Sequence, residues 1–114
     1  MKIYKKKIPR VFKVGIKNKI ILKDVGNVYL RDNENLTFIS GKNKKYEICK
    51  KNWGFYATSS VNKRLNKEGF KTALVKNWQN KFFVMIVDKN KKTSFKEYCN
   101  KEKYRIVQWL DTLK

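Results

Sequence analysis

The chain has 114 residues, and its 29 lysine and arginine residues outnumber nine acidic residues to give a formal net charge of +20. This length suits one domain, which we expect to span residues 1–114. Histidine is absent, which removes the commonest general base and the commonest metal ligand. The carboxylates show no spacing that marks an acid–base couple, so the sequence predicts no catalytic residue, no metal and no cofactor.

The positive charge has two explanations that the sequence leaves open. The first is an anionic partner, such as nucleic acid, an anionic glycan or a membrane surface. The second is composition, because all but four of the basic residues are lysine, and asparagine and isoleucine are also abundant, as an AT-rich genome would produce. The charge is spread along the chain, with +11 in residues 1–57 and +9 in residues 58–114.

The first half of the chain predicts a β-meander. Residues 1–10 are expected to form a basic, poorly ordered leader. Turn residues then separate short apolar runs, and the pair Gly26-Asn27 predicts a tight hairpin turn because both residues tolerate a positive φ. The predicted strands cover residues 11–14, 19–23, 28–31, 36–39 and 45–50.

The second half predicts two short helices among strands. A helix is expected over residues 60–68, with Gly69 as its terminator. Strands follow at 70–76 and 81–88. Six consecutive apolar residues occupy 82–87, which places the second of these strands at the centre of a sheet, buried on both faces. Ser94 and Glu97 form a capping-box pattern for a second helix. A final strand is predicted over 104–110, with a terminal helix as the alternative.

These elements predict an α+β fold with a mostly antiparallel sheet and two short helices. From residue 45 the order is β-α-β-β-α-β, which is compatible with a ferredoxin-like arrangement or with a curved mixed sheet that carries both helices on one face. An exposed sheet edge at 11–14 or 104–110 would allow a homodimer by pairing between chains.

Three further features concern the environment of the protein. The longest apolar run is too short to cross a bilayer, and the basic N-terminus leads into no signal-peptide core. Cys49 and Cys99 lie fifty positions apart, which is no metal-binding or redox spacing, so we expect free thiols in a reducing compartment. The sequence therefore predicts a cytoplasmic protein without a transmembrane segment.

Residues 52–65 hold the candidate site. Three hydroxyl residues precede the predicted helix, whose free N–H groups and dipole favour an anion, and two basic residues follow in its first turns. Trp53 and Tyr56 are expected to stack on a base or a sugar ring. The alternative is an ordinary helix cap beside buried aromatic residues. The predicted anion-binding residues are Thr58, Ser59, Ser60, Lys63 and Arg64.

Two segments of the sequence carry a resemblance to known proteins. Residues 52–65, N-W-G-F-Y-A-T-x-S-V-N-x-R-L, and residues 69–77, G-F-K-T-A-L-V-K-N, resemble small uncharacterised bacterial proteins. Those proteins are encoded among genes for surface-glycan and nonulosonic-acid synthesis. The resemblance covers about residues 10–110. It implies an accessory role near nucleotide-sugar or anionic-sugar chemistry. It brings no catalytic residue and no fold to this chain.

The leading interpretation is a small, basic, non-enzymatic binding or accessory protein with an anionic partner. The resemblance implies a nucleotide-sugar or an acidic glycan as that partner. One alternative is a nucleic-acid-binding protein that acts through lysine–phosphate contacts. The usual aromatic RNA-binding strand signature is missing, since residues 81–84 lack its glycine. The other alternative is a small enzyme for an anionic sugar, with Tyr56 or Cys49 activated by a lysine.

Overall fold

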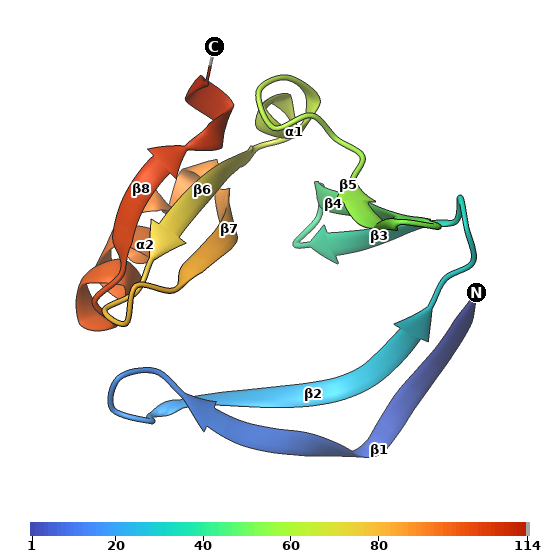
Figure 1. Ribbon diagram of the computed structural model, residues 1–114, viewed down its shortest axis with the longest axis horizontal. Helices are drawn as coiled ribbons and strands as arrows, with labels where there is room; N and C mark the ends of the chain where they lie inside the picture. Colours follow the sequence, from blue (N-terminus) through green and yellow to red (C-terminus); the bar gives the residue numbers. More distant parts are fainter. Residues whose placement is uncertain (114) are drawn as a thin grey trace. The chain divides into compact units, whose positions relative to one another are not determined.

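The computed structural model describes residues 1–113 as strands with few helices, and the described strand pairs are antiparallel (Figure 1). The expectation of a sheet-rich fold with mostly antiparallel strands is confirmed. The strands are β1 (Lys2–Val14), β2 (Ile20–Tyr29), β3 (Asn35–Ser40), β4 (Lys44–Lys51), β5 (Gly54–Ala57), β6 (Phe70–Lys76), β7 (Phe82–Asp88) and β8 (Arg105–Trp109). The helices are α1 (Arg64–Lys67) and α2 (Lys92–Lys101), with 3-10 turns η1 (Lys89–Lys91) and η2 (Leu110–Thr112).

The chain divides into two compact units. Unit 1 comprises Met1–Leu36 and Ile48–Tyr56, and unit 2 comprises Thr37–Glu47 and the chain from Ala57 onward. Each unit has a sheet of its own, and the strands β3, β4 and β5 form a further sheet in that order. The assignment of the whole chain to one domain stays a prediction.

The main element of unit 1 is the long antiparallel hairpin of β1 and β2. Residues 2–10, predicted to be a basic leader, form most of β1. The turn of the hairpin lies between the two strands, where Gly15 and Asn18 have φ values of +92° and +50°. The Asn18 N–H donates to the Gly15 carbonyl at 3.1 Å. Glycine and asparagine are the residues that adopt these angles most readily, which explains the position of the turn.

The predicted hairpin turn at Gly26-Asn27 is wrong, because β2 runs through both residues. Gly26 lies opposite Lys5, beside a shift in register. A Cβ atom at position 26 would overlap the carbonyl oxygen of Tyr4 on the neighbouring strand. Glycine at this position therefore allows a close approach of two backbones rather than a turn.

Unit 2 is built on the sheet β7-β6-β8, in which β6 pairs antiparallel with both neighbours. The alternation of β6 puts Ala73 and Val75 on one face and Phe70 and Thr72 on the other, and all four are buried. The strands predicted at 70–76 and 104–110 are thus confirmed as β6 and β8, and those at 36–39 and 45–50 as β3 and β4. Because β4 lies in another sheet, the ferredoxin-like order is not confirmed.

The helix α2 covers one face of this sheet. Trp109 lies opposite Ala73 in the register, so the two side chains share a face. The ring of Phe95 on α2 meets Trp109 edge-on, with ring centroids 5.9 Å apart. Cys99 on the same helix is buried. This face of β6, α2 and Trp109 form much of the core of unit 2.

The second predicted helix exists, but it starts earlier than the predicted capping box. The helix begins at Lys92, its first turn has no side-chain cap, and Ser94 lies within it. The side chain of Asp88 instead caps the preceding turn η1 by accepting the N–H of Asn90 at 2.8 Å. The chain therefore passes from β7 into α2 through one 3-10 turn.

The strand β7 is an edge strand, so its predicted place at the sheet centre is wrong. The central place belongs to β6. Phe82, Phe83 and Val84 are exposed, and only the far end of β7 is buried, at Val87. An unbroken apolar run is typical of a strand covered on both faces, but periodicity alone cannot show which strand of a sheet is central.

The helix α1 is a single turn against β6. Leu65 is its fully buried residue. Gly69 ends it with φ +100°, as predicted, and donates its N–H to the Asn66 carbonyl at 3.1 Å. Lys44 donates to the Gly69 carbonyl at 3.2 Å and to Asp88 at 2.6 Å, and its bond lowers the pKa of Asp88. These bonds join segment 37–47 to the rest of unit 2.

Candidate functional site

The predicted anion-binding residues lie in unit 2, around a helix that is much shorter than expected. The predicted helix covered residues 60–68, whereas α1 begins at Arg64 and has four residues. The Oγ of Ser60 accepts the N–H of Arg64 at 3.0 Å. One helical turn has too few aligned peptide units for a useful dipole, so the helix-terminus argument for this site does not apply.

Two of these residues are already engaged by carboxylates. Ser59 is buried, and its Oγ donates to Glu47 at 3.4 Å. The guanidinium of Arg64 lies 2.6 Å from Glu47 and 3.1 Å from Glu68. Its hydrogen bond to Glu68, followed by the charges of both carboxylates, raises the pKa of Arg64. An anion at this place would have to compete with two carboxylates for the guanidinium.

The other predicted anion-binding residues are Thr58, Ser60 and Lys63. The backbone N–H of Thr58 donates to the Glu47 carbonyl at 3.1 Å, which fixes the start of the segment. Lys63 and Ser60 are accessible, and Lys63 has no ion pair with a described residue. Binding of an anion over Thr58–Arg64 stays a prediction, now supported mainly by Lys63.

The two predicted stacking residues lie in unit 1, at and beside the turn between β4 and β5. Trp53 is 68% exposed and Tyr56 is 43% exposed. Their rings are stacked, with centroids 5.8 Å apart and planes 29° apart. Gly54 between them has φ +143°, and no atom would contact a Cβ added there. The backbone angle rather than a close approach therefore explains the glycine, and it brings the two rings together.

Two lysines precede these rings, at the end of β4. The Nζ of Lys50 lies 5.9 Å from the ring centroid of Phe55, which is itself exposed, and 3.1 Å from Asp32. The Nζ of Lys51 donates to Asn33 at 2.6 Å. Unit 1 as a whole carries twelve basic and three acidic residues. The prediction omitted the two lysines, although their position directly before the aromatic residues was visible in the sequence.

The possible reactive groups of an enzyme are poorly placed. Cys49 and Cys99 are free thiols and both are buried. Burial raises the pKa of the Cys99 thiol, which disfavours the reactive thiolate. Over residues 1–113 no three acidic or cysteine side chains come close enough to hold a metal ion.

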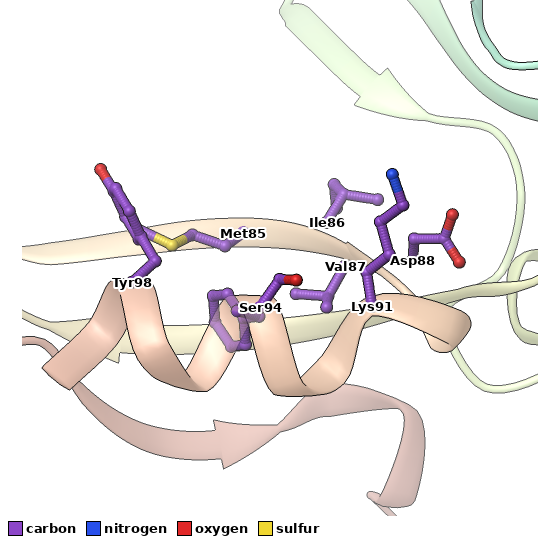
Figure 2. Close-up of a pocket in the computed structure, with 8 residues that line it drawn as sticks. Met85, Ile86, Val87, Asp88, Lys91, Ser94 and Tyr98 are labelled. Carbon is purple, nitrogen blue, oxygen red and sulfur yellow. The ribbon is translucent and has the colours of Figure 1, made fainter. Parts of the chain in front are cut away.

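A cavity of about 520 Å³ lies in unit 2 between β7 and α2 (Figure 2). Figure 2 shows Met85 and Tyr98 at one end of it, and Asp88 and Lys91 at the other. The middle is mostly apolar. The residues that line it are Met85, Ile86, Val87, Asp88, Lys91, Ser94, Phe95 and Tyr98.

Within the described residues, no helix has the length and apolar character needed to cross a membrane. No protein-family model, no curated protein and no solved structure matches the chain.

Proposed function

We propose that the protein is a non-enzymatic binding module for an anionic ligand that carries a flat ring, with a nucleotide-sugar as the leading ligand. The observation that carries the proposal is the exposed, stacked pair Trp53–Tyr56 on a chain of net charge +20. The resemblance to proteins encoded beside surface-glycan genes supports the same ligand class. An acidic glycan also offers an apolar ring face beside a negative charge.

The stacked pair suits this role for a physical reason. The two rings are already in contact, so they present an outer π-face without further ordering. Binding of a ligand ring therefore costs less conformational entropy than it would with two mobile side chains. Stacking of a base on an aromatic side chain contributes about 1–3 kcal/mol. Lys50 and Lys51 supply positive charge at the end of β4, within a few residues of the rings in the sequence. A diphosphate attached to the base would lie within the field of these lysines.

A second candidate, a single-stranded nucleic acid, is favoured by one observation. Both units are strongly basic, with net charges of +9 in unit 1 and +11 in unit 2. A polyanion can use charge that is spread over a whole chain, whereas a nucleotide-sugar uses only the charge near one site. The same stacked pair would then hold one base of the strand.

Titration with uridine diphosphate N-acetylglucosamine tests the proposal. Trp53→Ala should weaken binding about 5- to 150-fold, the range that corresponds to the loss of one stacked ring. Trp78→Ala is the matched control, because Trp78 is comparably exposed but lies in unit 2. It should leave the affinity unchanged. Equal effects of the two variants, or no binding at millimolar ligand, would contradict the proposal.

The salt dependence separates the two ligand classes. A short oligothymidylate held by several lysine–phosphate contacts should lose affinity steeply between about 50 and 200 mM salt. The nucleotide-sugar, with two phosphates, should lose little. Lys63→Gln adds a test of the predicted anion-binding segment, since a contribution from Thr58–Arg64 requires this exposed lysine. Tight, salt-sensitive binding of the oligonucleotide alone would favour the second candidate.

A further inference from the structure

We propose that the free edge of β7 accepts an extended, acidic peptide segment as an additional strand of the sheet. In the part of the chain that the structure describes, β7 has a strand neighbour on one side only. Three of its residues are exposed. A long, apolar, exposed edge is a ready template for another strand. This edge belongs to unit 2 and shares no residue with the stacked pair of unit 1, so the inference does not depend on the proposed ring ligand.

Two hydrogen bonds at the ends of the ladder fix which groups face the open edge. The Asn77 N–H donates to the Lys81 carbonyl, and the Lys89 N–H donates to the Gly69 carbonyl, both at 2.9 Å. In an antiparallel pair, every second residue bonds to the partner strand. Counting inward from both ends, the β7 residues bonded to β6 are Phe83, Met85 and Val87. Those that direct N–H and C=O groups outward are Phe82, Val84 and Ile86.

The cavity beside β7 would receive the side chains of the added strand. It lies between β7 and α2, and its walls are mostly apolar (Figure 2). Alternate side chains of a strand point to opposite faces, so every second side chain of the added strand would enter this cavity. The residues between would meet the opposite face, where Phe82 and Val84 are 57% and 61% exposed. Apolar residues in the segment therefore suit both faces of β7.

Charge decides the partner. Unit 2 carries seventeen basic and six acidic residues, and Lys81, Lys89 and Lys91 lie at the ends of β7. A second copy of the chain would bring the same positive charge to the edge and be repelled. An acidic segment would be attracted and would associate faster. The occupant inferred is thus an extended segment that is apolar along its middle and acidic at its two ends, where these lysines lie.

A proline at position 84 tests the edge directly. The Val84 N–H faces outward, so Val84→Pro removes a donor for the added strand and leaves the ladder with β6 intact. Val84→Thr is the matched control, because it keeps both the N–H and the β-branched shape. The probe is a fluorescein-labelled peptide with a run of valines flanked by glutamates at both ends, followed by anisotropy. Val84→Pro should weaken binding about tenfold or more, and Val84→Thr less than about twofold.

A second measurement keeps the inference falsifiable if the proline variant fails to fold. The same peptide is methylated on alternate backbone nitrogens, in one phase or the other. Methylation in the phase that bonds to β7 should abolish binding, and methylation in the opposite phase should preserve it. Equal binding of both methylated peptides would overturn the inference. So would a Val84→Pro effect confined to self-association of the free protein in sedimentation, because the edge would then serve a second copy.

Discussion

Replacing Asp111 by asparagine perturbs a buried ion pair that fixes the C-terminal turn of unit 2. The Asp111 side chain is only 3% exposed. Its Oδ2 accepts from Lys71 Nζ at 2.9 Å and from Asn66 Nδ2 at 3.2 Å. Asparagine has nearly the same shape but no charge. Asp111→Asn therefore leaves the ammonium of Lys71 largely buried without a counter-charge.

The size of the effect follows from the burial of both partners. Removing one member of a fully buried pair costs about 3–5 kcal/mol. The Lys71 side chain keeps 17% of its exposure, and its Nζ lies 4.8 Å from the ring centroid of Trp109, which also attracts the cation. We therefore expect a loss of about 2–3 kcal/mol in the free energy of unfolding. Asp32→Asn is the control, because its pair with Lys50 is solvent-exposed and should contribute less than about 1 kcal/mol.

Urea unfolding at several pH values measures this effect. Burial raises the pKa of Asp111, but the hydrogen bond and charge of Lys71, together with backbone hydrogen bonds, outweigh burial, so the pKa lies below its ordinary value of 3.8. The contribution of the pair is therefore present above that value and is lost as the pH falls through the folded-state pKa. The free energies of unfolding of the wild type and Asp111→Asn should differ at pH 7 and become equal in acid. A difference at pH 7 no larger than that of Asp32→Asn, or one that grows as the pH falls, would refute the reasoning.

Packing, backbone geometry and thiol access can each be tested by one experiment. Leu65→Ala should lower the free energy of unfolding by about 2–5 kcal/mol, because Leu65 is fully buried and its loss leaves a cavity; thermal unfolding checks this. Gly26→Ala should cost about 1–3 kcal/mol, since the new Cβ meets the Tyr4 carbonyl; unchanged backbone amide NMR shifts in β1 would contradict it. Cys49 and Cys99 should react with a thiol reagent only as fast as the chain opens, and a rapid phase of either thiol in the folded protein would count against their burial.

Local pattern was enough to predict several strands of the fold. The strict alternation of β6 and its turn residues predict 70–76, which are the bounds of the strand. Its central place in the sheet was not predictable, because strand order depends on contacts between segments far apart in sequence. The apolar run of β7 was therefore assigned the centre, which belongs to β6. The turn predicted at Gly26 was wrong for the same reason, because the Tyr4 carbonyl that requires a glycine there lies on another strand.

For the candidate site too, features that depend on contacts between distant segments could not be predicted from the sequence. The sequence predicted that Trp53 and Tyr56 stack on a ligand ring, and it did not predict that the two rings stack on each other. The engagement of Arg64 by Glu47 was not predicted either, because the carboxylate comes from a strand seventeen residues earlier. The predicted length of the helix over residues 60–68 was wrong. A capping pattern shows where a helix can begin, whereas packing decides how much of it forms.

The most direct test of the account is a two-dimensional ¹H–¹⁵N spectrum of the tryptophan indoles during titration with uridine diphosphate N-acetylglucosamine. The chain has three tryptophans, and their environments differ: Trp53 and Trp78 are exposed, and Trp109 packs against Phe95. We expect a saturating shift of the Trp53 indole signal alone, lost in Trp53→Ala. Saturation that moves the Trp78 or Trp109 signal and leaves Trp53 unchanged would contradict a binding site at the stacked pair.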